Sequence, residues 1–333
     1  MCILFVKRKL NKRLLSAKSV LIVLVVGLLL VFAGCDFADE DDEQTQIDDL
    51  PQSTQSKIVF MASPGDKLRF MNPDGSNVVR LTHHLASDIS PSWSPDGQRI
   101  AFMSSRDNGT GSTSDIDIYV MKADGSDLMN LTSNGQVFDG YPCWSPDGTR
   151  IAFVSRDDDG RQIFVMNADG TNRIVLTRSD FYSKEPCWSP DGGKIAFVSE
   201  PGRGVDDIFV MSADGTFPIN LTSHWSRNKT PRWSPDGEKI IFTSDRERGV
   251  NDIFVMNADG SNLVNLTNHP TVDESPCWSP DGDKIAFVSD RERSIDIYVM
   301  NADGTDIIKL TEPATGDGYA PTWSPWLRQG NLE

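Results

Sequence analysis

The sequence predicts an all-β protein, a six-bladed β-propeller with four antiparallel strands in each blade. Two short strings each recur six times, at intervals of 44 to 51 residues. Between them lie short runs of β-branched and aromatic residues, and no 3.6-residue helical period is sustained after residue 35. Four short strands in about 45 residues is the period of a propeller blade. The first string, Trp-Ser-Pro, begins at Trp93, Trp144, Trp188, Trp233, Trp278 and Trp323, and the second, Asp-Gly, begins at Asp74, Asp124, Asp169, Asp214, Asp259 and Asp303.

One repeat shows how the residues specify strands and turns. Residues 239–244 (KIIFTS) and 252–257 (DIFVMN) are rich in β-branched and aromatic residues and are expected to be strands. A tight turn at 234–237 (SPDG) precedes the first, because Pro presets φ and Gly accepts the positive φ that follows. Residues 258–260 (ADG) end the second strand in the same way. A short strand ending at Thr267 then leads to the next Pro-x-Trp.

The prolines indicate which strand is innermost. Twelve of the nineteen prolines lie in the six copies of Pro-x-Trp-Ser-Pro. Proline cannot donate a ladder hydrogen bond, so it is confined to edge strands and strand ends. The innermost strand of a blade is such an edge, since its free side faces the central channel. We therefore expect Pro-x-Trp on the innermost strand of every blade.

The order of the repeats predicts how the ring closes. The first part of the repeat region, with strands expected at 58–63, 67–72 and 78–82, lacks an innermost strand. Residues 319–324 form an innermost strand without its three partners. Together they would make the sixth blade, which removes the exposed edges of an open array. The propeller is thus expected to span 57–325, with a C-terminal tail at 326–333.

The N-terminal segment is typical of an export signal. Residues 1–34 hold six of the 32 basic residues and no acidic one, and residues 20–34 are uniformly apolar or small. This run is shorter than the ~20 residues that span a bilayer, as in a signal peptide. It ends Phe32-Ala33-Gly34-Cys35, which resembles the lipobox of bacterial lipoproteins. That resemblance implies cleavage before Cys35 and attachment of lipid to it; an uncleaved signal anchor is the alternative. Either reading places the body outside the cytoplasm, in the periplasm or at the cell exterior.

The charge of the remaining chain limits its partners. Residues 36–56 contain eight acidic residues and no basic one, so 35–56 is expected to be a disordered tether. The whole chain carries a formal net charge of −16, with 48 acidic residues. Because all the acidic residues follow Cys35, residues 35–333 carry −22. A body this acidic repels nucleic-acid phosphates, so no nucleic-acid partner is expected.

The repeat resembles a known family. The pattern W-S-P-D-G-x-K-I-A-F-x-S, D-I-Y-V-M-N-A-D-G and L-T is similar to the TolB-like, WD-type β-propeller repeat and covers residues 57–325 in six copies. The resemblance implies the propeller fold and says little about function. Similar propellers precede the catalytic domain of prolyl-oligopeptidase-like peptidases. Some propeller lyases also resemble this fold and use a metal held by histidines.

The repeat tryptophans and the cysteines before three of them are expected to be structural. The strict period of the six tryptophans favours packing between blades over ligand stacking. Cys143, Cys187 and Cys277 each precede a repeat tryptophan, which indicates a small buried slot between blades. Equivalent positions on different blades are expected to lie farther apart than the ~5.5 Å Cα spacing of a disulfide. The prediction is three free, inert thiols.

Acidic residues next to the innermost strands form the best candidate binding site. The propeller would bring them around one mouth of the channel, where a carboxylate ring could hold Ca²⁺ or attract a basic segment of a partner protein. Solvated turn residues are the simpler alternative. No cofactor other than this possible Ca²⁺ is expected. The residues of the expected ring are Asp88, Asp139, Glu185, Asp273, Glu274 and Asp317.

Two further sets of residues recur at matching positions. His84, His224 and His269 each follow the repeat Thr by two residues, which makes them weak candidates for a metal site. Their place near the rim favours loop residues instead. Four arginines after one strand and four aspartates that open the next are expected to pair across strands, with a structural effect of ~0.2–1 kcal/mol each. They are Arg106, Arg156, Arg246 and Arg291, with Asp117, Asp207, Asp252 and Asp296.

The sequence offers two hypotheses for function. It contains no Gly-x-Ser-x-Gly, no His-Glu-x-x-His and no phosphate-binding loop. The first hypothesis is therefore a non-catalytic lipoprotein of the cell envelope, a monomeric propeller that binds another envelope protein or peptide. The alternative is a protein that binds extracellular polysaccharide, or a metal-dependent lyase that uses the three histidines. Fold alone does not choose between them, since propellers serve many functions.

Overall fold

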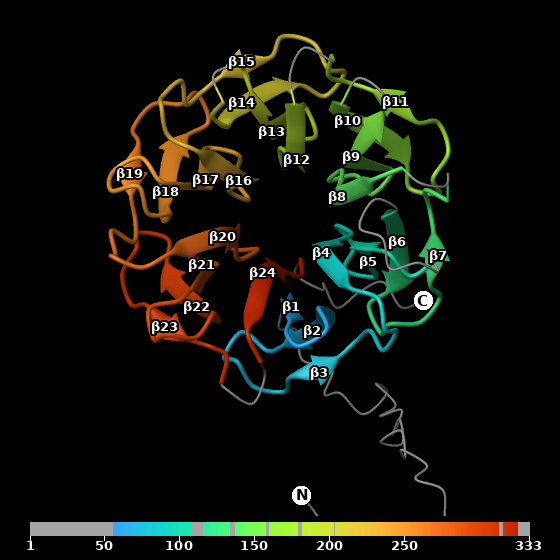
Figure 1. The fold of residues 1–333 in the computed structure, drawn as a ribbon, viewed down its shortest axis with the longest axis horizontal. Coiled ribbons are helices and arrows are strands. Elements are labelled where there is room, and N and C mark those ends of the chain that lie inside the picture. The colour runs from blue at the N-terminus through green and yellow to red at the C-terminus, as the bar shows by residue number, and fades with distance from the viewer. Residues whose placement is uncertain are drawn as a thin grey trace, which may run out of the picture. The chain divides into compact units, whose positions relative to one another are not determined.

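The computed structural model confirms the predicted fold. It describes residues 56–107, 116–133, 137–157, 160–178, 182–202, 204–312 and 316–325. All named elements in these ranges are strands, arranged as six four-stranded antiparallel sheets around a central channel (Figure 1). In these ranges there is no helix long and apolar enough to cross a lipid bilayer. The expected signal peptide, Cys35, all but the last residue of the acidic tether, and the C-terminal tail lie outside the described residues.

Each blade begins at the channel with a strand that carries Pro-x-Trp, as predicted. A hairpin connects this innermost strand to the second strand, except in the blade that joins the chain ends. The innermost strands are β4 (Asp88–Trp93), β8 (Asp139–Trp144), β12 (Tyr182–Trp188), β16 (Asn228–Trp233), β20 (Asp273–Trp278) and β24 (Gly318–Trp323). The second strands are β5 (Arg99–Ser104), β9 (Arg150–Asp157), β13 (Lys194–Glu200), β17 (Lys239–Ser244), β21 (Lys284–Ser289) and β1 (Ile58–Ala62).

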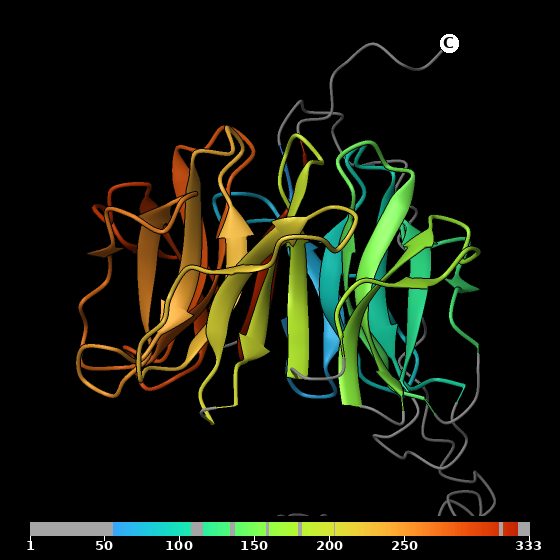
Figure 2. The same cartoon turned by 90° about the horizontal axis from the view of Figure 1, so that it is seen from above.

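The outer half of each blade completes the sheet. Viewed from the side, the strands run between the two faces of the ring (Figure 2). The third strands are β6 (Asp117–Lys122), β10 (Gly160–Asn167), β14 (Asp207–Ser212), β18 (Asp252–Asn257), β22 (Asp296–Asn301) and β2 (Lys67–Met71). The outermost strands have two residues each: β7 (Met129–Asn130), β11 (Ile174–Val175), β15 (Ile219–Asn220), β19 (Val264–Asn265), β23 (Ile308–Lys309) and β3 (Val79–Arg80). Such short outer strands leave little free edge for pairing with another chain.

The ring closes between the two ends of the repeat region, as predicted. The sheet order β24-β1-β2-β3 joins the last strand of the chain to the first three. Ile58 pairs with Trp323 and Ala62 pairs with Gly318. Beyond the ladder, the Ser324 amide donates to the carbonyl of Lys57 at 2.7 Å, and the Lys57 amide donates to Ser324 Oγ at 2.7 Å. The closing blade therefore depends on hydrogen bonds between residues more than 250 positions apart.

The Trp-Ser-Pro-Asp-Gly turn has a defined set of hydrogen bonds, shown here in the blade of β12–β15. This is the fourth blade when the blades are counted along the chain from the closing blade, which contains β1. Ser189 Oγ donates to Asp191 Oδ1 at 2.6 Å and accepts from the Lys194 amide at 2.9 Å. The Gly192 amide closes the turn onto the carbonyl of Ser189 at 2.9 Å, and the φ of Gly192 is +71°. Glycine adopts this left-handed conformation without the steric cost that a Cβ brings. These bonds lower the pKa of Asp191, because the Ser189 hydroxyl stabilises its carboxylate.

The core lies between neighbouring blades. Trp144 packs against Ala101 and Ile118 of the preceding blade and against Ile151 and Phe153 of its own. Trp188, Trp233, Trp278 and Trp323 bridge the following blade interfaces in the same way, and all five are at least nine-tenths buried. Trp93 occupies the equivalent position and is half-buried. A fully buried large apolar side chain contributes about 1.5–3 kcal/mol, so these tryptophans hold the blades together.

Closure of the ring generates a stability prediction. We expect deletion of residues 318–333 to abolish cooperative thermal unfolding, because it removes β24 and exposes the edge of β1. The measurement is the melting transition followed by circular dichroism. Deletion of residues 326–333 alone is the control, since it leaves the ladder between β24 and β1 intact. A longer deletion that unfolds as cooperatively, and at the same temperature, as the control would contradict the proposed contribution of closure.

Candidate binding channel

A β-bulge in every innermost strand turns side chains into the central channel. In β20, Glu274 pairs with Val288 and Cys277 with Ala286, so Ser275 and Pro276 lie opposite one residue of β21. Bulges of this kind bend a strand and redirect a side chain. The proline is tolerated here because the free edge of the strand faces the channel. The first bulge residue has a φ between 47° and 55° in all six blades, although none is glycine.

These strained residues form what we call the bulge ring. Non-glycine residues in the left-handed region cost about 1–3 kcal/mol each and are concentrated at functional sites. All six line a cavity of about 630 Å³ in the channel. Their side chains are of five types in the six blades, whereas Pro, Trp, Ser and Pro at the neighbouring positions are the same in all six. The bulge ring consists of Ser90, Tyr141, Glu185, Thr230, Ser275 and Ala320.

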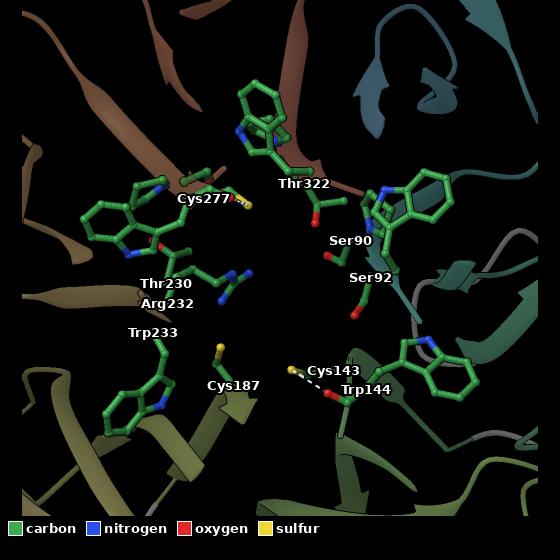
Figure 3. Close-up of a pocket in the computed structure, with 18 of the residues that line it drawn as sticks. Ser90, Ser92, Cys143, Trp144, Cys187, Thr230, Arg232, Trp233, Cys277 and Thr322 are labelled. Carbon is green, nitrogen blue, oxygen red and sulfur yellow. Dashed lines mark hydrogen bonds between the residues drawn. The ribbon is translucent and has the colours of Figure 1, made fainter. Parts of the chain in front are cut away.

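A second set of channel side chains, the thiol–arginine ring, comes from the residue before each tryptophan. Because this residue lies two positions after the bulge residue, it also lines the cavity. Figure 3 shows the labelled side chains of this set around a central space. The three cysteines are free thiols that pack against the apolar clusters between blades, as predicted, and the structure adds that they also line the cavity. The thiol–arginine ring consists of Ser92, Cys143, Cys187, Arg232, Cys277 and Thr322.

The bulge ring also connects adjacent blades. Glu185 Oε2 accepts a hydrogen bond of 2.6 Å from the Thr230 amide of the next blade. Thr230 Oγ1 lies 2.9 Å from Thr243 Oγ1, which accepts from the Ser275 amide at 3.2 Å. Tyr141 is half-buried. Its burial and, to a smaller extent, the negative charge of the nearby Glu185 raise the pKa of its phenol. The wall of the channel is therefore held in place by bonds between blades.

The predicted carboxylate ring does not form. Asp88, Asp139 and Asp273 have no exposed surface, because each begins an innermost strand and points into its own blade. Only Glu185 and Glu274 of the predicted set line the cavity. Asp317 is half-buried next to the closing blade, where its carbonyl accepts from the Ser63 amide at 2.9 Å.

The three buried aspartates take arginine partners, which corrects the predicted pairing. Asp88 bonds Arg106 at 2.6 Å, Asp273 bonds Arg291 at 3.0 Å, and Asp139 bonds Arg173 at 3.0 Å. Arg156, which was expected in this set, is exposed. In the fifth blade the partner is neutral: Arg246 donates to Asn228 Oδ1 at 3.1 Å.

The aspartates that open the third strands serve the loop at the end of the outermost strand instead. Asp207 accepts from Asn220 Nδ2 at 2.8 Å and from Thr222 Oγ1 at 3.3 Å. The Thr222 hydroxyl in turn accepts from the Ile208 amide at 2.8 Å. Asp117, Asp252 and Asp296 each accept a bond from the repeat Thr in the same way. The threonine of the repeated Leu-Thr therefore connects the third strand of the blade to the end of the outermost strand through hydrogen bonds.

The histidines do not come together. They lie in the loops that follow three different outermost strands, and each ring bonds a residue two positions later in its own loop. His84 Nδ1 accepts from the Ala86 amide at 3.1 Å, whereas His224 and His269 bond Ser226 and Thr271. No group of three or more His, Cys, Asp or Glu side chains in the described ranges is arranged to hold a metal ion.

Apart from Glu185 and Glu274, the sequence prediction missed the channel-lining residues, although a signal was present. When the six copies of Pro-x-Trp-Ser-Pro are aligned, the residues before and after the first Pro vary in size and charge while the others do not. Arg232 is the most unusual of them, since four of its five equivalents are Cys or Ser and the fifth is Thr. Positions at which the residue varies among otherwise identical repeats are candidates for function.

The buried ion pairs generate a prediction with an internal control. Arg291 and Arg246 stack on equivalent aromatic rings and differ mainly in their partner, the charged Asp273 or the neutral Asn228. We expect Arg291→Met to destabilise the fold by about 3–5 kcal/mol, because it leaves a buried carboxylate without its counter-charge. Arg246→Met leaves a neutral amide and should cost about 1–2 kcal/mol.

The measurement for this pair is the free energy of unfolding in urea. Equal losses of unfolding free energy in the two variants would show that the charge of the arginine's partner does not affect stability. The double variant Arg291→Met with Asp273→Asn should recover part of the loss, since it removes the unpaired charge.

Comparison with known proteins places the fold in a family. The sequence matches the TolB beta propeller domain family over residues 111–202, 172–250 and 246–329. The Tol-Pal system protein TolB of Alcanivorax borkumensis is 30% identical over 119 residues, which are 34% of this chain and 26% of that protein. Dipeptidyl-peptidase 5 of Porphyromonas gingivalis is 38% identical over 71 residues, which are 21% of this chain and 10% of the peptidase.

A solved structure agrees with the sequence match. TolB from Acinetobacter baumannii superposes with a TM-score of 0.70 at 20% identity, covering 83% of this chain and 68% of that one. At this identity the likeness shows the fold alone, and the two curated relatives are matched over about a quarter of their length or less. The family matches, however, extend over residues 111–329, which is more than half of the chain. This chain therefore belongs to the TolB beta propeller domain family.

Proposed function

We propose that this protein is a non-catalytic scaffold of the bacterial cell envelope, which binds a segment of another envelope protein in its central channel. The observation that carries the proposal is the contrast between the repeat and the channel wall. Scaffold positions are the same in six blades, whereas the bulge ring and the thiol–arginine ring differ in size, charge and hydrogen-bonding groups. A six-fold scaffold with an asymmetric wall suits an asymmetric ligand such as a polypeptide.

The chemistry of the wall supports a polypeptide ligand. The cavity offers hydroxyl groups from Ser90 and Thr322, an aromatic ring from Tyr141, and charges of both signs from Lys229 and Glu274. A polypeptide presents backbone amides, carbonyls and mixed side chains that match such a set. The membership of the TolB beta propeller domain family agrees with this proposal, as does the similarity to a Tol-Pal system protein. The lyase alternative lacks this support, because its three histidines lie in separate loops and each bonds a residue of its own loop.

Photo-crosslinking tests the channel as the binding site. A photoreactive phenylalanine analogue replaces Tyr141 in the channel or, as a matched control, Phe217, which is 79% exposed on the outer side of the fourth blade. We expect irradiated cells to give a discrete adduct from position 141 that position 217 does not give. Glu274→Lys should weaken the adduct, because it reverses a charge on the channel wall. An adduct from position 217 alone would contradict binding in the channel.

We further propose that the propeller is exported and attached to a membrane through lipid on Cys35. The support is the order of segments in the sequence: a basic segment, the apolar run at 20–34, the cysteine and then the acidic segment. The lipid would hold the chain at the membrane surface, and the acidic segment would act as the tether of a single propeller.

Fatty-acid labelling tests the lipid anchor. Cys35→Ser should abolish incorporation of a labelled fatty acid and move the protein from the membrane fraction to the soluble fraction. Cys2→Ser is the control, since Cys2 lies within the proposed signal and should not affect labelling of the mature chain. Labelling that survives the Cys35 substitution would refute lipid attachment at this residue.

A further inference from the structure

Three thiols and one guanidinium occupy neighbouring positions of the thiol–arginine ring. Proceeding around the channel, Cys143 comes from β8, Cys187 from β12, Arg232 from β16 and Cys277 from β20. Figure 3 shows the side chain of Arg232 extending into the space between the thiols. Cys143 packs against the apolar cluster that contains Cys187 and Trp233. The arrangement places a permanent positive charge beside two thiols and brings a third thiol next to one of them.

Arg232 lacks a carboxylate partner. Its hydrogen bond goes to the carbonyl of the preceding residue, Pro231, at 2.9 Å. No carboxylate in the described ranges lies within ion-pairing distance of this guanidinium, unlike Arg106, Arg173 and Arg291. Because a guanidinium stays charged at all physiological pH values, a half-buried one favours an anion beside it. Besides Glu185, the groups of the channel wall that act on Arg232 as anions are the thiols, with Cys187 first.

The three thiols have different pKa values because their surroundings differ. The neighbouring Cys143 side chain and the charge of Arg232 lower the pKa of Cys187 to about 6, although burial opposes them. The same interaction with Cys187, together with burial, raises the pKa of Cys143. Burial also raises the pKa of Cys277. The other titratable or charged groups that line this cavity are Tyr141, Glu185, Lys229 and Glu274.

We propose that the channel contains a reactive cysteine, in which Cys187 is the nucleophile, Arg232 its counter-ion and Cys143 the resolving thiol, and that it exchanges with small disulfides. This site goes beyond the proposed binding function and does not depend on it. The thiolate is the form of cysteine that attacks disulfides, and a neighbouring arginine favours it. Cys187 is only 8% exposed, and it lines the cavity, through which a small disulfide would reach it. A thiolate next to a second cysteine is the arrangement of residues that undergo reversible oxidation.

The chemistry proceeds in two balanced steps. First, Cys187 Sγ attacks one sulfur of a small disulfide RSSR, forms a mixed disulfide and releases one thiolate, RS⁻. Then Cys143 loses its proton to RS⁻ and attacks Cys187 Sγ, which forms the Cys143–Cys187 disulfide and expels the second RS⁻. The two cysteines are oxidised by two electrons, and the small disulfide is reduced to two thiols.

Site-resolved alkylation tests the nucleophile. The folded full-length protein, in detergent, is treated with limiting iodoacetamide between pH 5 and 9, and mass spectrometry quantifies each cysteine separately from Cys2 and Cys35. We expect half-maximal alkylation of Cys187 near pH 6 and of Cys277 above the ordinary thiol range. At pH 6 Cys187 should react about tenfold faster than Cys277. This ratio allows for the lower intrinsic nucleophilicity of a low-pKa thiol. Equal rates at pH 6 would overturn the proposal.

Two substitutions of Arg232 test the counter-ion. Arg232→Gln should move the midpoint of Cys187 alkylation to higher pH, whereas Arg232→Lys, which keeps the charge, should hold it low. Cys277→Ser is the matched control, because it removes the other thiol beside Arg232 without removing the charge. Thermal melts establish that each variant is folded. A midpoint that does not move in a folded Arg232→Gln variant would overturn the assignment of Arg232.

Reaction with oxidised glutathione tests the resolving thiol. In the unaltered protein we expect the Cys143–Cys187 disulfide, with two glutathione molecules released for each protein chain. In Cys143→Ser the mixed disulfide should accumulate on Cys187, with one glutathione released. A mixed disulfide that persists in the unaltered protein would exclude Cys143 as the resolving thiol, and an adduct confined to Cys277 would overturn the whole site.

Discussion

The pairing of β24 with β1 is the contact on which the rest of the structure depends. It joins residues near the two ends of the repeat region, and it converts an array of sheets into a closed ring. Only a closed ring brings the innermost strands of the first and last repeats side by side. The channel, its bulge ring and its thiol–arginine ring therefore all depend on this one ladder. The entropy lost in closing so long a loop must be offset by the burial of apolar surface between blades.

The innermost strand carries the same residues on one side in every blade and different residues on the other. The side that faces the neighbouring blade carries the same tryptophan in every copy, because each interface presents the same gap to fill. The side that faces the channel is not required to fill a gap, so its residues are free to differ. Here they include a carboxylate, a guanidinium, a phenol and three thiols. The β-bulge makes this division possible, since it turns an extra residue of each strand toward the axis.

Polar groups within the blades are satisfied by local networks. Buried aspartates at the start of the innermost strands are neutralised by arginines that also stack on aromatic rings, as Arg106 does on Phe102 and Tyr119. The fifth blade replaces the ion pair by Arg246 and Asn228, which shows that hydrogen-bond geometry rather than charge is the common feature. Burial lowers the pKa of Arg246, although the nearby carboxylates of Asp207, Glu247 and Asp245 oppose the shift. Arg232 differs from all of these because its neighbours are thiols.

The sequence by itself determined the number of blades, the strands of each blade, the position of Pro-x-Trp on the innermost strand and the closure by a strand at 319–324, which is β24 in the structure. These features follow from the spacing of turn residues and from the missing hydrogen-bond donor of proline, which act over a few residues. Only the tertiary structure decided which side chains reach the channel. A strict two-residue alternation does not foresee a bulge at Ser275, and a pattern of acids does not reveal that Asp88 is buried against Arg106. Likewise, the packing of Cys143 against the cluster that contains Cys187 arises from the curvature of the ring, which brings strands 44 residues apart in sequence to the same wall.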